Sequence, residues 1–503
     1  MVSLAGSKVL TDPGKLGPEL LELLVERLSL LLGHGGDATR RRPYTWRVPR
    51  VRELLAIALV AVAAATQIPY PGWNAGAHYA LVRSLVDGTP RIDKHLNQSG
   101  DIAWVDGHFY AAKSPGLAFF SIPAYLAFDA AGATYATYVS GQGPPGARQV
   151  PERSIWQVNL TVVAAFLVLL LLMRAVVERL FPRRGTAVAL MLGLGTMLLP
   201  FATAYFSHVV SATLGFAAFA LLLRERQRRS ERALAAAGLL AGLSVFTELP
   251  TGIVGVCLGL YVAADAPRLR RAAIYGAGFG AGLLPLAAYN WWAFGSPLRN
   301  GYSNAVKELG KTGHDVIGAN GEGFFGLTYP HPKAAWDILF STHGLFVLTP
   351  VTLVAVLGLV LLDRAGHRRE AALVGGMTLA FVVYNASYYL PFGGASPGPR
   401  FLVALLPFLA LPLAAVVARW PLIAFAAAAV SAFWMVAATI AGPLLPLEMS
   451  PTTWLSQIRH GTEVMGSMFG KGTTGAVVFL VPALAAVVLA FWPQRQTGAL
   501  PTA

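Results

Sequence analysis

The sequence predicts an all-α protein that crosses a membrane many times. Hydrophobic residues make up 55% of its 503 residues, charged residues only 13%, and the mean hydropathy is +0.56. A soluble domain carries about 25% charged residues. Apolar runs of about 20 residues, the length of a helix that spans a bilayer, recur along the chain. Lysine and arginine gather in short segments between these runs, which predicts that those segments face the cytoplasm.

The lysines and arginines in the segments between the apolar runs explain the net charge of +14. A soluble protein with such an excess would be expected to bind nucleic acid, but these cations occupy segments between helices, so we expect no nucleic-acid partner. The single cysteine, Cys257, excludes an intrachain disulfide and a cysteine-based metal cluster. The histidines are too widely spaced to form a recognisable metal signature. No metal or other cofactor is predicted, and a divalent cation is not indicated.

Residues 1–50 are predicted to form a cytoplasmic segment. Within it, residues 16–32 are apolar but carry four charged side chains, which indicates an amphipathic helix on the membrane surface and not a span. The arginines at 40–42 and 47–52 place the start of the first span inside the cell. Residues 493–503 are predicted to form a cytoplasmic tail.

A bundle of about twelve transmembrane helices is predicted within residues 51–492. The predicted spans are 53–70, 155–175, 186–203, 209–223, 233–248, 250–264, 272–292, 343–362, 371–390, 401–418, 421–441 and 474–492. If the apolar segment 117–131 also crossed, the arginines that follow 155–175 would lie outside. We therefore expect it to be a short interfacial or re-entrant helix on the outer face. The long connections 71–154, 293–342 and 442–473 then all face outward.

The first outer connection concentrates polar residues that could carry chemistry. A carboxylate beside a substrate hydroxyl can act as a general base, worth about 10²–10⁴-fold in rate, and Asp93 and Asp101 are the alternative candidates. Spacing alone does not separate this role from a structural one. Asp106 precedes Gly107 and is predicted to form a turn. Lys113 is a candidate cation for phosphate, although a solvated connector is the alternative for the whole stretch.

Two other regions hold candidate site residues. Arg400 ends a Gly- and Pro-rich loop before span 401–418, where it could bind phosphate or reach lipid headgroups. Glu248 and His208 lie at predicted outer ends of spans, and ionisable residues at membrane depth are costly enough to suggest function. Further candidates for substrate binding in the outer connections are His108, Tyr110, Arg299 and Tyr302.

Several short motifs lie between roughly residues 50 and 420. They are DGHFY (106–110), KSPG (113–116), FGSP (294–297), GLF (344–346) with TP (349–350), and GPRF (398–401) with LPF (406–408). Together they resemble a bacterial branch of the glycosyltransferase C superfamily, related to protein O-mannosyltransferases and lipid A aminoarabinose transferases. That superfamily uses polyprenyl-phosphate sugars and commonly has its catalytic carboxylate just after the first span. Here Asn74 and His78 occupy that neighbourhood. The resemblance therefore implies a base at Asp101 or Asp93, with Asn74 and His78 in substrate binding.

The predicted function is inverting transfer of a sugar from a polyprenyl-phosphate carrier to an extracytoplasmic hydroxyl. The acceptor would be a cell-envelope glycan, lipid or protein, and the site would face outward from the bacterial inner (plasma) membrane. Asp101 or Asp93 would remove the acceptor proton, and Lys113 and Arg400 would bind the donor phosphate. Two alternatives are open: a flippase for lipid-linked sugars or other transporter, and a non-catalytic partner in cell-envelope assembly.

Overall fold

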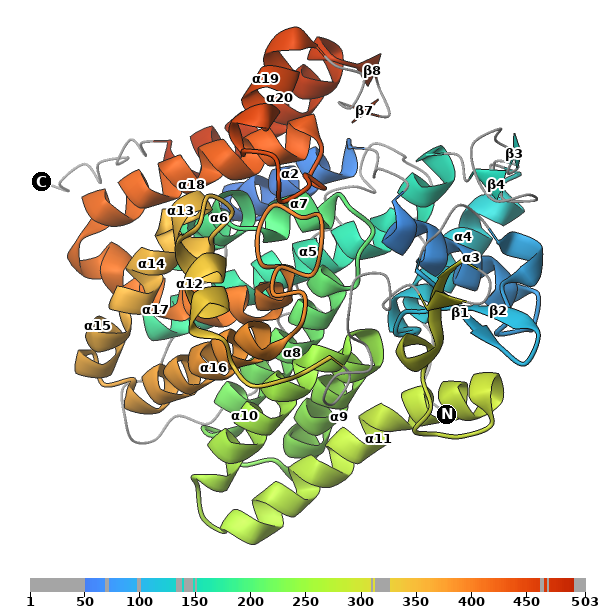
Figure 1. Cartoon of the computed structure of the whole chain (residues 1–503). Coiled ribbons are helices and arrows are strands. Elements are labelled where there is room, and N and C mark those ends of the chain that lie inside the picture. The colour runs from blue at the N-terminus through green and yellow to red at the C-terminus, as the bar shows by residue number, and fades with distance from the viewer. Residues whose placement is uncertain are drawn as a thin grey trace, which may run out of the picture. The chain divides into compact units, whose positions relative to one another are not determined.

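The computed structural model describes residues 50–67, 72–96, 101–132, 138–139, 148–149, 152–308, 311–312, 326–461, 466–467 and 470–492. All of them belong to one unit, residues 48–503. The predicted amphipathic helix in 1–50 and the predicted tail 493–503 lie outside the described residues. The described chain is mostly helical (Figure 1), as its apolar runs predict.

Among the described residues, six helical segments are long and apolar enough to cross a membrane. They are Ser154–Leu180 within α5 (Glu152–Leu180), His208–Glu225 (α8), Arg268–Phe294 (α11), Arg400–Arg419 (η4, Arg400–Leu405, with α17, Leu406–Arg419), Pro421–Ala441 (α18) and Thr473–Phe491 (α20). A seventh is counted if the helices on either side of a 98° bend, Pro332–Leu348 and Pro350–Arg364, form one span. The predicted number of twelve is therefore not confirmed.

The other predicted spans are helical but are not among these six, and apart from the 20-residue α16 they are short or broken. They are α2 (Val51–Ala65), α6 (Gly185–Gly195), α7 (Leu198–Ala202), α9 (Glu231–Thr247), η2 (Leu249–Thr251), α10 (Gly252–Ala263), α13 (Leu345–Leu348), α14 (Pro350–Leu357), α15 (Leu359–Arg364) and α16 (Arg368–Ser387). A 15-residue helix is about 22 Å long, whereas the hydrocarbon core is about 30 Å thick. The predicted span 186–203 breaks because Thr196 takes an extended conformation, with φ −133° and ψ 167°.

Helices α9 and α11 lie side by side (Figure 1), with their backbones in close approach. Gly238 and Gly242 of α9 face Gly278 and Gly282 of α11. A Cβ atom at Gly278 would lie only 2.1 Å from the carbonyl oxygen of Ala235, so the contact requires glycine. Small residues spaced by four allow such close van der Waals packing between helices in a membrane.

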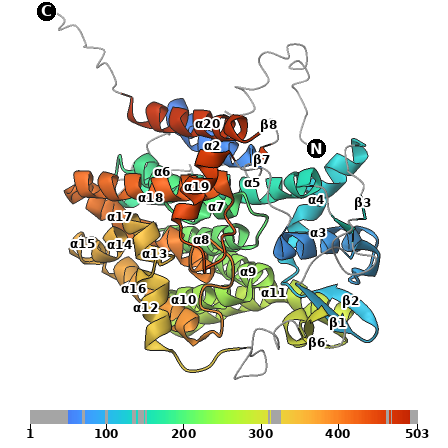
Figure 2. The same cartoon turned by 45° about the horizontal axis from the view of Figure 1, so that its top comes forward.

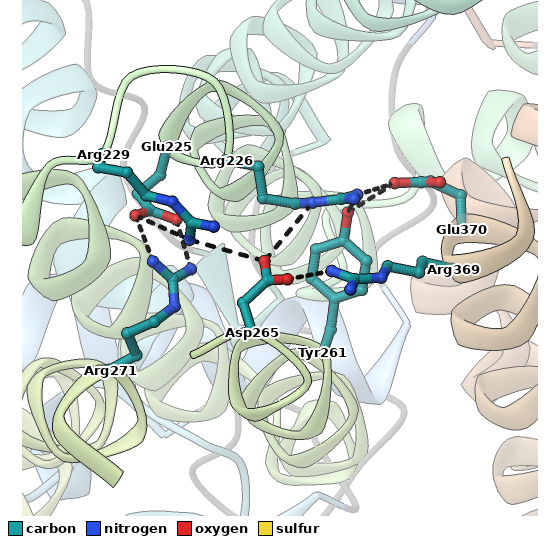
Figure 3. Close-up of polar contacts among 8 residues, drawn as sticks. All are labelled: Glu225, Arg226, Arg229, Tyr261, Asp265, Arg271, Arg369 and Glu370. Atoms are coloured by element: carbon teal, nitrogen blue, oxygen red, sulfur yellow. Dashed lines mark hydrogen bonds and ion pairs between the residues drawn. The ribbon is translucent and has the colours of Figure 1, made fainter. Parts of the chain in front are cut away.

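At the arginine-rich end of α8, buried carboxylates meet arginines from α11, from α16 and from the segment that follows α8 (Figure 3). Both guanidinium Nη atoms of Arg271 donate to Glu225, each at 2.6 Å. Arg226 pairs with Glu370 at 2.5 Å and lies 3.7 Å from Asp265. Arg369 also pairs with Asp265, Arg229 approaches both Glu225 and Asp265, and Tyr261 donates to Glu370. Because buried carboxylates need such partners, the network ties together the ends of α8, α10, α11 and α16.

The first outer connection contains α3 (Trp73–Val86), η1 (Asp93–His95), the hairpin β1 (Ile102–Val105) and β2 (His108–Ala111), and α4 (Gly116–Ala130). Asp106 and Gly107 form the two-residue hairpin turn, with φ of 49° and 82°. Two positive φ values are what a type I′ turn requires, so the turn predicted for Asp106 is confirmed.

The hairpin belongs to a larger sheet that joins two outer connections. The strands β5 (Ala305–Glu308) and β6 (Lys311–Thr312) extend it in the order β2-β1-β5-β6, and Figure 2 shows β6 beside the hairpin. The remaining described elements are η3 (Gly301–Asn304), α12 (Pro332–Phe340), α19 (Thr452–His460), and the strand pairs β3 (Tyr138–Val139) with β4 (Arg148–Gln149) and β7 (Gly466–Ser467) with β8 (Gly470–Lys471). Because β1 pairs with β5, the helix η3, which directly precedes β5, lies beside the end of the first outer connection.

Candidate functional site

Polar side chains from segments far apart in the sequence converge at one end of the bundle. They are Asp101 and Lys113 around the hairpin, His208 at the start of α8, Glu248 at the end of α9, Tyr302 in η3 and Arg400 at the start of η4. Each lies at a helix end or connection that the sequence assigned to the outer side. Helix α8 is about 25 Å long, so this cluster and the network around Glu225 lie at opposite ends of α8.

Lys113 is a largely enclosed cation of the cluster. Its Nζ lies 2.9 Å from Asp101 Oδ1, and the two side chains are only 11% and 26% exposed. The ring of Tyr302 lies 5.5 Å from the ammonium. Burial lowers the pKa of Lys113, the Asp101 carboxylate opposes that shift, and the Arg400 guanidinium adds to it. Lys113 and Arg400 are therefore close enough to repel one another electrostatically.

Two glycines allow the segments to approach closely enough to form this cluster. A Cβ atom at Gly116 would lie 2.7 Å from the carbonyl oxygen of Phe246, so the start of α4 lies directly against the end of α9. A Cβ atom at Gly301 would lie 2.6 Å from the carbonyl oxygen of Ala111. The second contact seats η3 on the end of β2 and thereby places Tyr302 beside Lys113.

Glu248 is buried in a network of hydrogen bonds. Its Oε1 lies 2.6 Å from Nδ1 of His208, and its Oε2 accepts a hydrogen bond from the Ser211 hydroxyl at 2.9 Å. The Glu248 side chain is 8% exposed. Both carboxylate oxygens of Glu248 thus have partners, and its side chain is less exposed than that of Asp101.

Arg400 is held by aromatic rings and glycine backbone. Its guanidinium lies 5.8 Å from the ring centre of Phe206 and 5.5 Å from that of Phe401. Gly393 has φ +83°, and a Cβ atom there would lie 2.4 Å from Arg400 Nε, which itself is buried without a hydrogen-bond partner. Within the part of the chain that the structure describes, no carboxylate forms an ion pair with Arg400. A positioned guanidinium of this kind suits an anionic ligand.

Asp93, the other candidate base, does not join the cluster. Its Oδ2 lies 2.9 Å from Nδ1 of His108, and its Oδ1 accepts a hydrogen bond from the Phe109 amide at 2.8 Å. The Asp93 side chain is 39% exposed. These contacts connect η1 to β2, so a structural role explains the position of Asp93.

His108 and Tyr110 line a different space from the cluster. A cavity of about 510 Å³ lies over the hairpin and the end of α11, lined in part by Arg91, Asp106, His108, Tyr110 and Trp292. Neither Asp101, Lys113 nor Arg400 lines it. This cavity is therefore separate from the charged cluster.

Arg299 also lies apart from the enclosed part of the site, with its side chain exposed. Of the residues predicted from sequence, the structure brings together Asp101, Lys113, Arg400, Glu248, His208 and Tyr302.

Asn74 and His78 lie one turn apart on α3, beside the cluster. His78 is 1% exposed, and neither of its ring nitrogens has a partner. Burial, followed by the positive charge of Lys113, lowers the pKa of His78 to about 3, against the influence of Asp101. His78 is therefore neutral near pH 7. Its ring meets that of Tyr205 edge-on, with centroids 6.2 Å apart.

Sequence reasoning missed the roles of Tyr205 and Asn159. Tyr205 lies in the turn before α8 with φ +39°, rare for a residue with a bulky side chain. Asn159 of α5 holds this turn: its Oδ1 accepts from the Tyr205 amide at 2.9 Å and its Nδ2 donates to the Ala202 carbonyl at 3.0 Å. A buried asparagine within an apolar run was the signal that could have revealed it.

No family model and no curated protein matches this sequence. Solved structures do show similarity. ArnT from Cupriavidus metallidurans is 16% identical with a TM-score of 0.48, over 87% of this chain and 75% of that one. The Archaeoglobus fulgidus oligosaccharyltransferase is 12% identical with a TM-score of 0.47, over 87% and 56%. The arabinosyltransferase EmbB from Mycobacterium smegmatis is 16% identical with a TM-score of 0.43, over 96% and 41%.

Proposed function

We propose that the protein is a membrane glycosyltransferase that moves a sugar from a polyprenyl-phosphate carrier to an acceptor hydroxyl. The observation that carries this proposal is the convergence of Lys113, Arg400 and Asp101 at one end of the bundle. Two cations that repel one another are stabilised by an anion between them. A phosphate at the head of a membrane lipid can reach this end of the helices. Among the similar structures, one of ArnT is bound to undecaprenyl phosphate and one of the archaeal oligosaccharyltransferase contains a dolichol-phosphate.

In the proposed reaction, Asp101 takes the proton of the acceptor hydroxyl. The hydroxyl oxygen forms a bond to the anomeric carbon of the sugar as the bond from that carbon to the phosphate oxygen breaks. The electron pair of the broken bond stays on the phosphate. Lys113 and Arg400 stabilise the charge that develops there, which is commonly the largest contribution to catalysis. A single displacement of this kind inverts the configuration of the anomeric carbon.

Asp101 is preferred as the base because of its surroundings. Its side chain is 26% exposed, so a substrate can approach it, whereas the side chain of Glu248 is only 8% exposed. Asp93 supports the hairpin through His108 and Phe109. Because the Lys113 ammonium lies beside Asp101, the carboxylate that would face the acceptor is adjacent to the cation that would bind the phosphate.

The transferase is favoured over a flippase by where the charges lie. In the described membrane-spanning helices, charged residues lie within about two turns of a helix end. A transporter would be expected to place them near the midplane of the bilayer. We further propose that the site faces the extracytoplasmic side of the bacterial plasma membrane, since the arginine-rich end of α8 lies opposite to it.

The proposal is tested first by binding. Full-length protein in nanodiscs should bind undecaprenyl phosphate, and Lys113→Ala or Arg400→Ala should each weaken that binding by about tenfold or more, because a hydrogen bond to a charged group contributes about 1.5–3 kcal/mol. Lys333→Ala is the matched control, since Lys333 is 86% exposed and pairs with Asp337 of its own helix. Equal binding by all three variants would contradict the proposal.

Turnover is tested with radiolabelled polyprenyl-phosphate sugars and an envelope extract as the source of acceptors. Asp101→Asn should lower transfer by about 10²–10⁴-fold, while binding of undecaprenyl phosphate is kept within a few fold. Asp93→Asn should retain most of the activity. The assignment of the base is wrong if Asp93→Asn abolishes transfer and Asp101→Asn does not.

A further inference from the structure

The cavity of about 510 Å³ over the hairpin and the end of α11 has the size of a binding site. Small-molecule sites occupy about 300–1,000 Å³. Its lining residues come from three segments: 88–91 between α3 and η1, 106–110 around the hairpin turn, and 292–295 at the end of α11. The rings of Tyr110 and Phe294, 5.1 Å apart, connect the second segment to the third. The cavity is therefore built on packed elements and not on one loop.

The polar side chains of the cavity can both donate and accept hydrogen bonds. The Arg91 guanidinium is a donor and the Asp106 carboxylate is an acceptor, and both side chains are exposed. Nδ1 of His108 lies 2.9 Å from Oδ2 of Asp93. Because an ionised carboxylate can only accept, Nδ1 carries the proton, and the neutral ring keeps Nε2 as an acceptor for a ligand. Sugar hydroxyls suit such a mixture, since each hydroxyl both donates and accepts.

Trp292 adds an aromatic surface to the same cavity and is 48% exposed. The adjacent Trp291 is 65% exposed and does not line the cavity. A belt of aromatic residues at the membrane interface accounts for Trp291, whereas Trp292 lies next to hydrogen-bonding groups. A sugar ring has an apolar face of C–H bonds and an edge of hydroxyls, so it can pack on the Trp292 indole while its hydroxyls meet the polar side chains.

Other ligand classes fit this cavity less well. Among the described residues that line it, a proline and an alanine are the only aliphatic ones, which leaves little surface for an acyl chain. For a phosphate, the single lining arginine is balanced by Asp106. A peptide strand could add to β2, which is at the edge of its sheet. However, the amide of Phe109 in β2 already donates to Asp93, and its carbonyl already accepts from the amide of Ile92.

The hairpin fixes the distance between this cavity and the proposed base. Asp106 at the turn and Asp101 just before β1 are five positions apart, which is about 17 Å in an extended strand. In the proposed reaction the donor sugar is attached directly to the phosphate beside Lys113, so this one sugar does not reach the cavity. An acceptor of several sugar units can fill the cavity with one part and present a hydroxyl to Asp101 with another.

We propose that this cavity binds the acceptor of the transfer, and that the acceptor is an oligosaccharide. The inference rests on the proposed function and narrows the acceptor from a glycan, lipid or protein to a glycan. Arg91, Asp106, His108 and Trp292 hold a part of the acceptor that lies away from the reacting bond. Their loss should therefore change the affinity for the acceptor and not the chemical step.

The test is binding to full-length protein in nanodiscs. The ligands are tetrasaccharides of the common neutral hexoses and pentoses, labelled at the reducing end, a serine-rich peptide with the same label, and undecaprenyl phosphate. The wild type should bind at least one tetrasaccharide and not the peptide. Trp292→Ala should weaken that binding by about tenfold. Asp106→Asn should weaken it by about 2- to 10-fold, because the amide loses a charged acceptor oxygen while asparagine before glycine still favours the hairpin turn.

Trp291→Ala is the matched control, because it removes the same side chain one position away and outside the cavity. It should leave the affinity for the tetrasaccharide unchanged. Binding of undecaprenyl phosphate should be the same in all three variants. Lys113→Ala should weaken binding of undecaprenyl phosphate alone.

The role as acceptor is tested by transfer from radiolabelled polyprenyl-phosphate sugars to the tetrasaccharide that binds most tightly. The product should carry one additional sugar. Trp292→Ala should raise the KM for the tetrasaccharide by about tenfold and keep kcat within a few fold.

The outcomes separate the two proposals. If the wild type binds undecaprenyl phosphate but no tetrasaccharide, or binds the peptide instead, the inference is overturned and the proposed phosphate site stands. The inference is also overturned if Trp291→Ala and Trp292→Ala weaken tetrasaccharide binding equally, or if the bound tetrasaccharide receives no sugar. If tetrasaccharides bind and undecaprenyl phosphate does not, the proposed function fails and the acceptor role fails with it.

Discussion

Two adjacent arginines of α11 offer a direct test of the buried ion network. Arg271 donates to both oxygens of Glu225 at 2.6 Å, and the two side chains are 7% and 1% exposed (Figure 3). Its neighbour Arg270 pairs with Glu231 at the same distance of 2.6 Å, but those side chains are 70% and 58% exposed. The chemistry and the distance are matched, so burial is the main difference.

The expected magnitudes follow from that difference. Arg271→Met leaves Glu225 buried without its main partner, and breaking one side of a buried pair costs about 3–5 kcal/mol. Arg270→Met removes a pair that water screens, worth about 0–1 kcal/mol. The double variant Glu225→Met with Arg271→Met should recover most of the loss, because replacing both partners by apolar residues is often neutral.

The assay is chemical unfolding in detergent micelles, followed by circular dichroism at 222 nm, for the wild type, both single arginine variants and the double variant. The proposed binding of undecaprenyl phosphate at the other end of α8 is measured as an independent check of the folded state. Similar losses in unfolding free energy for Arg270→Met and Arg271→Met would refute the reasoning from burial.

Three further predictions concern helix contact, the turn before α8, and pH. Gly278→Ala should destabilise the protein, because its Cβ would lie 2.1 Å from a backbone oxygen of α9, whereas Gly276→Ala has open space and should be neutral or slightly stabilising in the same unfolding assay. Asn159→Ala should cost about 2–4 kcal/mol, because the Tyr205 amide and a buried carbonyl lose their partners; unchanged stability would show that water replaces them. The pKa of His78 is about 3 in the folded protein against 6.5 ordinarily, so the unfolded state binds more protons between these values. Stability should therefore fall by up to a few kcal/mol as the pH drops from 6.5 toward 3, and His78→Gln should remove that part of the fall in acid unfolding curves.

The helix positions were largely predictable. The runs predicted at 209–223, 421–441 and 474–492 match α8, α18 and α20 within a few residues. Hydropathy succeeds here because a helix in lipid must be apolar along its whole length and satisfies its own backbone hydrogen bonds. It did not reveal the breaks at Thr196 and Thr349, where the chain leaves the helix inside an apolar run.

The hairpin could have been predicted but was not. Asp106-Gly107 stands between Ile102–Val105 and His108–Ala111, and such a dipeptide between two short apolar segments is among the strongest local hairpin signals. The hairpin also makes Asp93 a weaker candidate for the base, because Asp93 accepts a hydrogen bond from the amide of Phe109 in β2.

The sequence by itself determined that the chain is an apolar helical bundle whose polar residues collect at particular helix ends, since hydropathy and charge act locally along the chain. Only the tertiary structure decided which of those residues meet. Lys113 and Arg400 are 287 positions apart in sequence, yet they act on one another electrostatically because α4 packs against α9, and α9 and η4 both pack against α8. The choice of Asp101 over Asp93, and the grouping of His78 with Tyr205, depend on such long-range packing. Spacing along the chain cannot encode it, because the distance between two loops is set by the contacts of every helix between them.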